Sequence, residues 1–158
     1  MTLVFTDIVD STVFAESAGD AAWAETVGGH ETAIRSITAA HGGRVIKFLG
    51  DGSMLAFESA RAAVRAAVDI QRSAAVGPFA VRVGIHTGET IRTADDVLGL
   101  TVSKAARIAS AAGAGQILAS STTRDMVGSL EGVQIGEPQT VALKGFSDTH
   151  QIVLLEWE

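Results

Sequence analysis

Two aspartates follow short apolar runs in different parts of the chain, and their carboxylates are the groups best placed to do chemistry. Asp7 stands in TLVFTDIVDST, and Asp51 lies in the Gly-Asp-Gly turn of VIKFLGDGSMLAF. If the strands that carry them are neighbours in a sheet, the carboxylates repel each other and each pKa rises unless cations fill the gap. Oxygen ligands of this kind favour Mg²⁺, with waters and substrate phosphates completing its coordination. The pattern therefore predicts a divalent-metal site suited to displacement at phosphorus.

Each of these residues also has an ordinary structural explanation when it is taken alone. A Gly-Asp-Gly hairpin is usually a plain turn, and an aspartate after a strand often begins a loop or caps a helix. Lys47, inside the strand before that turn, would be a solubilising charge on an edge strand. Asp96 would be a polar residue leading into a helix. Only the combination of these residues favours a functional site.

The composition excludes several other classes of protein. The chain has 158 residues, of which 47% are hydrophobic, and 18 acidic against 12 basic residues give a net charge of −6. This balance leaves no electrostatic footprint for binding nucleic acid. The absence of cysteine removes disulfides, thiolate nucleophiles and thiolate zinc sites. Since the apolar opening ends at Asp7, we expect no signal peptide, no membrane segment and a cytoplasmic location.

Apolar periodicity and turn residues predict the elements that must position these side chains. In order, we expect a buried strand over residues 3–9, a helix from an Asp20 N-cap to Gly42-Gly43, strands Arg44–Leu49 and Ser53–Phe57, a helix from a Ser59 cap to about Ala75, a strand Phe79–Thr87, a polar stretch Glu89–Asp96, and a helix from about Leu100 to Ala112. Weaker signals predict strands at Gln116–Ala119 and near Val133, Val141 and Ile152–Leu155, with a short helix at Ser121–Val127. This order predicts one α+β domain over residues 1–158, with a ferredoxin-like βαββαβ core and an additional C-terminal helix and strands.

Five segments of the chain occur in the order typical of class III adenylyl cyclase catalytic domains. They are TLVFTDIVDST, VIKFLGDGSMLAF, VRVGIHTGE, DDVLGLTVSKAARIAS and VALKGF. The chain therefore resembles this family over essentially its whole length, and its Ala-Ala-Arg triplet resembles that of a bacterial branch. The resemblance implies the class III nucleotidyl cyclase fold, ATP as substrate, and two Mg²⁺ or Mn²⁺ per active site. It also implies a homodimer whose active sites lie at the subunit interface.

The resemblance assigns the two aspartates to the metals. By position, Asp7 and Asp51 would bridge the two ions, assisted by the backbone carbonyl of Ile8. The loop that follows, including Ser11 and Thr12, would hold the phosphates through its amides. This chain has Asp10 and Ser11 where the family usually has Gly-Phe in that loop.

The resemblance also explains a lysine inside a strand, because Lys47 and Asp96 occupy the purine-selecting positions. Adenine presents an acceptor at N1 and a donor at its exocyclic amine, whereas guanine presents the reverse. A lysine can only donate and an ionised aspartate can only accept, so this pair matches adenine. A mismatched buried donor or acceptor is costly, which is how such a pair discriminates.

The remaining implied roles fall on the third helix and near the C-terminus. Ser103 and Arg107 are four residues apart and share a helix face. Arg107 matches the arginine that stabilises charge on the α-phosphate, although alone it would be read as part of a solvated face. Ser103 replaces the ribose-orienting asparagine, and its shorter side chain would lower turnover.

Lys144 matches the lysine that reaches the triphosphate, while Phe146 replaces a second lysine. His86 is expected to be a packed, hydrogen-bonded residue.

These expectations define an adenylyl cyclase that converts ATP to 3′,5′-cyclic AMP and pyrophosphate, with each active site built from both protomers. One alternative is a guanylyl cyclase, which the Lys47 and Asp96 pair does not suit. A diguanylate cyclase would carry a Gly-Gly-Asp/Glu-Glu-Phe turn, which is absent here. Another alternative is a weak or silent nucleotide-sensing or dimerisation domain, which only the serine at position 103 supports.

Overall fold

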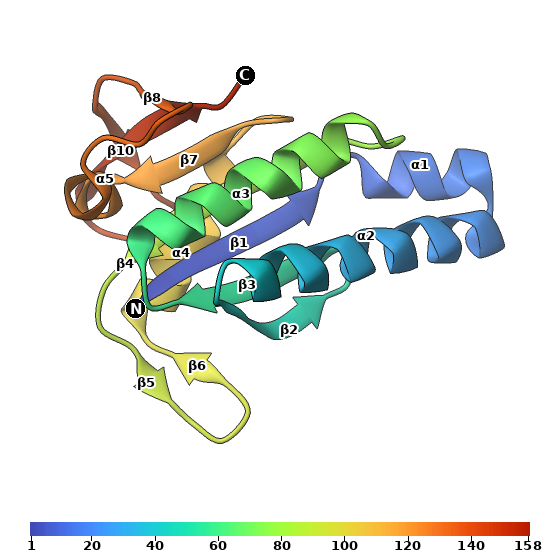
Figure 1. Cartoon of the computed structure of the whole chain (residues 1–158), viewed down its shortest axis with the longest axis horizontal. Coiled ribbons are helices and arrows are strands. Elements are labelled where there is room, and N and C mark those ends of the chain that lie inside the picture. The colour runs from blue at the N-terminus through green and yellow to red at the C-terminus, as the bar shows by residue number, and fades with distance from the viewer.

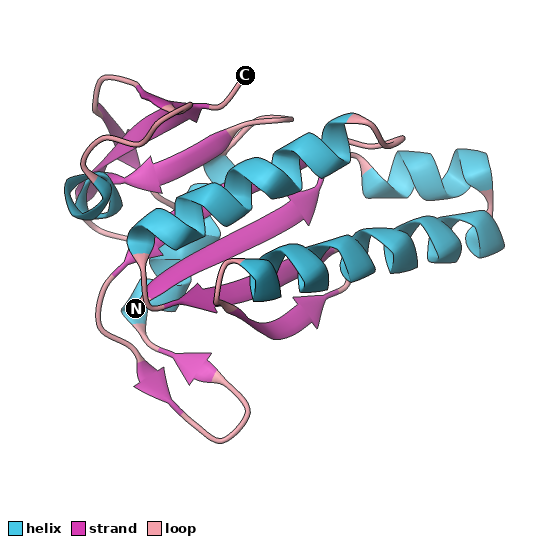
Figure 2. Cartoon of the chain, in the orientation of Figure 1, coloured by secondary structure: helices cyan, strands magenta, loops and turns pink.

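One mixed β-sheet forms the centre of the fold, and helices pack on both of its faces (Figures 1 and 2). The computed structural model describes residues 1–158. The strands are β1 Thr2–Ile8, β2 Arg44–Leu49, β3 Gly52–Phe57, β4 Val81–Thr87, β5 Ile91–Arg92, β6 Val97–Leu98, β7 Ile117–Ser120, β8 Gln134–Ile135, β9 Gln139–Ala142 and β10 Thr149–Glu156. The helices are α1 Ser11–Ala18, α2 Asp20–Ala40, α3 Ala60–Ala75, α4 Leu100–Ala111 and α5 Ser121–Val127. No helix combines the length and the apolar composition that crossing a membrane requires.

The strand order confirms the predicted α+β fold with a ferredoxin-like core. The main sheet runs β2-β3-β1-β4-β7-β10-β8, and β9 pairs with β10. Strand β1 is antiparallel to both of its neighbours, β3 and β4, and Thr6 pairs with Ser53 in that register. The continuous apolar run of β1 suits this central place, because a central strand is covered on both faces. The end of β1 therefore lies beside the β2–β3 turn, as the sequence predicts.

The two faces of the sheet are buried to different extents. The face under α2 and α3 contributes to a core cluster of 22 buried residues, whereas the α4 face has two clusters of 7 and 5. Along β1, Val4 belongs to the large cluster, while Leu3 and Phe5 belong to the cluster of 7 on the α4 face. Since side chains alternate along a strand, Asp7 follows Phe5 onto the α4 face.

The segment after β1 differs from the prediction. A separate helix, α1, precedes α2, and both project beyond the sheet in Figure 1. The predicted N-cap at Asp20 is wrong, because Gly19 (φ +87°) is the cap and Asp20 is the first residue of α2. Glycine readily takes this positive φ, which allows the chain to turn sharply between the two helices. The Asp20 carboxylate still lies at the positive end of the α2 dipole.

Three further segments were predicted imperfectly. The polar stretch Glu89–Asp96 contains strand β5, which pairs with β6 in a hairpin that projects from the body (Figure 1). Strand β4 begins at Val81 rather than at Phe79, whose ring packs among aromatic side chains instead. The strand predicted near Val133 is the short strand β8, which begins one residue later, after an isolated bridge between Val133 and Leu130.

Candidate active site

The carboxyls of Asp7 and Asp51 lie next to each other where β1 ends and the β2–β3 hairpin turns. Burial raises the pKa of Asp7 above its usual value, a hydrogen bond from Arg82 opposes that rise, and the hydrogen bond and charge of Asp51 add to it. A Cβ atom on Gly52 would lie 2.6 Å from the Thr6 carbonyl oxygen and 3.7 Å from Oδ1 of Asp7. Only glycine fits there, and its small size brings the turn up against β1.

Arg82 is a residue of this site that the sequence reasoning missed. It is the register partner of Asp7 on β4, and its Nε and Nη2 atoms donate to Oδ2 of Asp7 at 3.0 Å and 2.6 Å. Both hydrogen bonds fall on Oδ2, so Arg82 does not occupy Oδ1, which lies on the side of Gly52 and Asp51. In the sequence, Arg82 is a charged residue inside an apolar strand. Lys47 has the same feature, and this feature could have indicated a functional role for Arg82.

The Asp7 and Asp51 carboxylates suit a hard divalent cation. Their repulsion, which contributes to the raised pKa of Asp7, would be relieved by a cation between them. The chain has no group of three or more histidine, cysteine or acidic side chains that could hold a metal ion. A metal bound here would therefore take its other ligands from backbone carbonyls, water or a substrate, which is typical of Mg²⁺.

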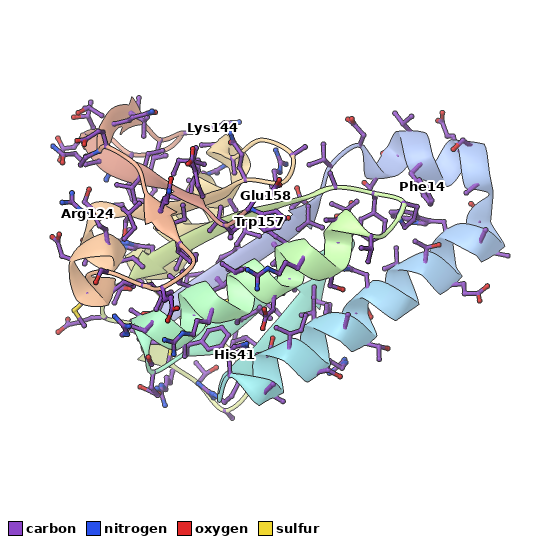
Figure 3. The ribbon with its side chains drawn as sticks, turned by 45° about the horizontal axis from the view of Figure 1, so that its top comes forward. Phe14, His41, Arg124, Lys144, Trp157 and Glu158 are labelled. Atoms are coloured by element: carbon purple, nitrogen blue, oxygen red, sulfur yellow. The ribbon has the colours of Figure 1, made fainter.

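An open hollow of about 460 Å³ adjoins Asp51 and is formed largely by α1. Its lining residues are Ser11, Thr12, Ala15, Glu16, Asp20, Trp23, Gly50 and Asp51. Helix α1 buries none of its own residues, and its Phe14, which is labelled in Figure 3, packs against other aromatic rings. The Phe14 ring lies 5.2 Å from that of Trp23 and 6.3 Å from that of Phe79, centroid to centroid. The hollow therefore brings Ser11 and Thr12 together with Asp51, as expected.

Asp10, just before α1, has a backbone conformation that explains one departure from the cyclase pattern. It is the only non-glycine residue with a positive φ, at φ 56° and ψ 37°. Glycine adopts this left-handed region without strain, and aspartate is among the few other residues that tolerate it. The loop keeps the backbone shape that glycine would allow, at a local energetic cost.

Lys47 and Asp96 meet although they lie 49 residues apart in the sequence. The Lys47 Nζ atom donates to Oδ2 of Asp96 at 3.0 Å, and the Val97 amide donates to Oδ1 at 2.8 Å. The Val97 amide and the Lys47 ammonium together hold the pKa of Asp96 below its usual value. Asp96 is therefore ionised and accepts at both oxygens, while Lys47 donates.

A β-bulge in β2 directs Lys47 to the α4 face. The register with β3 shifts between Val45 and Lys47, so Val45 pairs with Leu55 and Lys47 pairs with Met54. Leu55 belongs to the large core and Met54 to the cluster on the α4 face. Without the extra residue, Val45 and Lys47 would share a face by simple alternation. Bulges commonly redirect a side chain in this way.

Three predicted residues remain apart from both pairs. Ser103 and Arg107 lie on the exposed side of α4, opposite its buried residues Thr101, Ala105, Ile108 and Ala109. Lys144 is also exposed, and in Figure 3 it lies near the C-terminal strands, away from Phe14 on α1. None of these three side chains makes a hydrogen bond or ion pair within the chain. A single protomer thus assembles two pairs and leaves these side chains free.

His86 is a packed residue, as expected from the sequence. Its Nδ1 atom lies 2.6 Å from Oγ of Ser120, and its side chain is buried on β4. Burial, together with the positive charges of Lys104 and His150, lowers the pKa of His86 to about 4. It is therefore neutral at pH 7 and supports the sheet rather than the chemistry.

Comparison with known proteins places this geometry in a family. The chain matches the adenylate and guanylate cyclase catalytic domain over residues 1–156. It is 33% identical over 144 residues to an uncharacterised protein of Mycobacterium tuberculosis, with 90% of this chain and 37% of that protein covered. The chain thus spans little more than a third of the length of the curated relatives that it matches first.

Solved structures include enzymes of both nucleotide specificities. The adenylyl cyclase CyaB of Pseudomonas aeruginosa is similar with a TM-score of 0.86 and 26% identity, covering 98% of this chain and 92% of that one. The guanylyl cyclase Cya2 is similar with a TM-score of 0.83 and 25% identity, covering 98% and 90%. These matches confirm the class III cyclase fold and leave the choice of purine open. The chain belongs to the adenylate and guanylate cyclase catalytic domain family.

Proposed function

We propose that this domain is an adenylyl cyclase that converts ATP to 3′,5′-cyclic AMP and pyrophosphate. The observation that favours adenine over guanine as the base of the substrate is the contact between Lys47 Nζ and Asp96 Oδ2 at 3.0 Å. In this pair the ammonium can donate to N1 of adenine, and the carboxylate can accept from its exocyclic amine. Guanine offers a donor and an acceptor at the opposite positions, so it would leave both groups unsatisfied.

Asp7, Asp51 and the backbone carbonyl of Ile8 would hold two divalent ions, Mg²⁺ or Mn²⁺. When bound, such ions supply Lewis-acid activation of the ribose 3′-hydroxyl and neutralise the triphosphate. The loop with Ser11 and Thr12 borders the open hollow beside Asp51 and would bind the phosphates there. Arg82 would keep Asp7 oriented with Oδ1 toward the ions, because it occupies Oδ2.

The reaction is an in-line displacement at the α-phosphate. The 3′-oxygen forms a bond to that phosphorus, the bond to the bridging oxygen of pyrophosphate breaks, and the hydroxyl proton is released. Arg107 would offset the negative charge that develops on the α-phosphate. Ser103 would orient the ribose, and its short hydroxyl would do so through a water molecule. Lys144 would bind the departing pyrophosphate.

The arrangement requires a homodimer, in which Asp7 and Asp51 of one protomer face Lys47, Asp96, Ser103 and Arg107 of the partner subunit. Support comes from the side chains that one protomer leaves free, above all Arg107 and Lys144. Support also comes from exposed apolar residues around the β5–β6 hairpin: Ile91 is 65% exposed, Leu98 47% and Leu100 78%. Apolar groups gathered on a surface in this way mark protein interfaces.

Product identification tests the proposed function. The domain is incubated with ATP or with GTP in the presence of Mn²⁺, and the products are separated and identified by mass spectrometry. We expect cyclic AMP and pyrophosphate from ATP, little product from GTP, and none with Asp51→Ala. Cyclic GMP as the preferred product would overturn the choice of purine.

The serine at position 103 favours a second candidate, a domain that binds nucleotide without turning it over. Loss of the asparagine amide removes one of the groups that would orient the ribose. Metal-dependent release of pyrophosphate separates the two candidates, because a silent domain releases none.

A further inference from the structure

The β5–β6 hairpin holds Asp96 more firmly than its ion pair with Lys47 could. The side chains of Lys47 and Asp96 are 41% and 29% exposed, and exposed ion pairs contribute little because water and salt screen them. Such a pair alone would leave the carboxylate free to rotate away. A purine acceptor, however, must present one oxygen in one direction to reject the wrong base.

Thr93 supplies the missing constraint from the other side of the turn. Its amide donates to the Asp96 carbonyl oxygen at 2.9 Å. Its Oγ1 atom accepts from the Asp96 amide at 3.0 Å and lies 3.3 Å from the Asp96 carbonyl oxygen, to which it can donate. Both backbone polar groups of Asp96 are therefore bound by the same residue.

The side chain of Asp96 is constrained in the same region. The Val97 amide occupies Oδ1 at 2.8 Å, so Oδ2 is the oxygen that meets Lys47. A carboxylate oxygen can accept two hydrogen bonds, which leaves one acceptor site on Oδ2 beside the Lys47 ammonium. The turn thus leaves Oδ2 as the oxygen that a purine beside Lys47 would meet.

We propose that Thr93 is a positioning residue for purine selection, whose hydroxyl fixes the turn so that Asp96 presents Oδ2 beside Lys47. This inference rests on the proposed function, because it assigns Asp96 to the purine. Thr93 follows β5 in the hairpin, is exposed, and belongs to none of the buried core clusters. Both hydrogen bonds of its hydroxyl are to Asp96, so removing the hydroxyl should act on Asp96 first.

The test compares Thr93→Val, which removes the hydroxyl at almost constant shape, with Thr93→Ser, which keeps it. Thr140→Val is the matched control, because Thr140 is an exposed strand residue whose side chain makes no hydrogen bond. Steady-state kinetics with ATP and GTP give kcat and KM for each. For Thr93→Val we expect the ATP-over-GTP ratio of kcat/KM to fall about tenfold. A change of this size corresponds to the loss of one hydrogen bond, here the bond between Thr93 Oγ1 and the backbone that positions the Asp96 carboxylate.

Most of that fall should come from a higher KM for ATP, while kcat stays within about twofold of wild type because Arg107 and the metal-binding carboxylates are untouched. Thr93→Ser and Thr140→Val should keep the wild-type ratio. Amide hydrogen exchange at Asp96 and Val97 should be faster in Thr93→Val than in the other proteins.

The outcomes separate this inference from the function on which it rests. If wild type makes cyclic AMP and Thr93→Val keeps the full ATP preference, the positioning role is wrong and the function stands. If Thr93→Ser loses as much preference as Thr93→Val, the hydroxyl is not the cause. If wild type prefers GTP, both are overturned. If wild type makes no cyclic nucleotide, the function is overturned, and unchanged exchange at Asp96 in Thr93→Val would overturn the positioning role as well.

Discussion

The two faces of the central sheet differ in what they bury. The α2 and α3 face contributes to 22 buried residues in one cluster, whereas the α4 face divides its core into clusters of 7 and 5. The charged residues Asp7, Arg82 and Lys47 all project on the α4 side, from three different strands. One face supplies most of the hydrophobic stabilisation, and the other leaves room for ionised groups.

Strand β1 shows how a single element serves both faces. Val4 lies on the α3 side, while Leu3 and Phe5 pack on the other side and Asp7 follows them at the strand's end. Burying a charge is costly unless it is paired, and Arg82 pairs Asp7 where α4 ends. The smaller hydrophobic clusters on the α4 face therefore leave space for the candidate site.

The largest expected effect comes from Asp51→Asn. If Asp7 and Asp51 hold the metals as proposed, removing one carboxylate should lower cyclic nucleotide formation at least about a thousandfold, because metal catalysis contributes several kcal/mol. Urea denaturation should show no loss of stability, since the repulsion between Asp51 and Asp7 is relieved. Activity above a tenth of wild type would show that the pair does not hold the metals.

A matched pair of truncations on β3 sharpens the contrast between the faces. Leu55 and Met54 are both fully buried, and they point to opposite sides of the sheet. Leu55→Ala should lower the free energy of unfolding by about 3–4 kcal/mol without changing the ATP-over-GTP ratio. Met54→Ala should cost about 2–3 kcal/mol and reduce that ratio, because Met54 is the register partner of Lys47. Equal effects on the ratio would remove the distinction.

The buried histidine on the α4 face predicts a loss of stability in acid. The pKa of His86 is about 4 in the folded state against about 6.5 when unfolded. The unfolded chain therefore takes up the proton first, and stability is lost as the pH falls from about 6.5 to about 4. Relative to wild type, His86→Gln should reduce this loss by about 2 kcal/mol, measured by urea denaturation at pH 7 and pH 4.5. Parallel pH curves for the two proteins would contradict this origin.

The smallest effect concerns the loop between β1 and α1. Asp10 has a left-handed backbone conformation, so Asp10→Gly should raise the free energy of unfolding by up to about 1 kcal/mol. Asp10→Ala should lower it, because alanine tolerates positive φ less well than aspartate does. Thermal denaturation of both variants decides between these signs. A gain for both would show that the aspartate charge, rather than the backbone, is responsible.

Local patterns were sufficient to predict much of the fold and the first half of the site. The run before Asp7, the Gly-Asp-Gly turn and the Ser59 cap each depend on neighbouring residues, and the structure confirms all three. The approach of Asp7 to Asp51 followed from strand order alone.

Features set by tertiary contacts could not be predicted in this way. The bulge in β2 that directs Lys47, the β5–β6 hairpin that holds Asp96, and the pairing of Arg82 with Asp7 depend on register. The break at Gly19 depends on a single positive φ. Such features arise from strand pairing and packing, which apolar periodicity does not specify.

Subunit complementation tests most directly the claim that the α4 faces of two protomers share one site. Asp7→Ala and Arg107→Ala chains are each assayed alone and then mixed, with mixed dimers verified by native mass spectrometry. Each variant alone should be inactive, and the mixture should recover about a quarter of wild-type activity, because half of the dimers are mixed and each of those has one intact site of two. No recovery despite abundant mixed dimers would contradict the shared site.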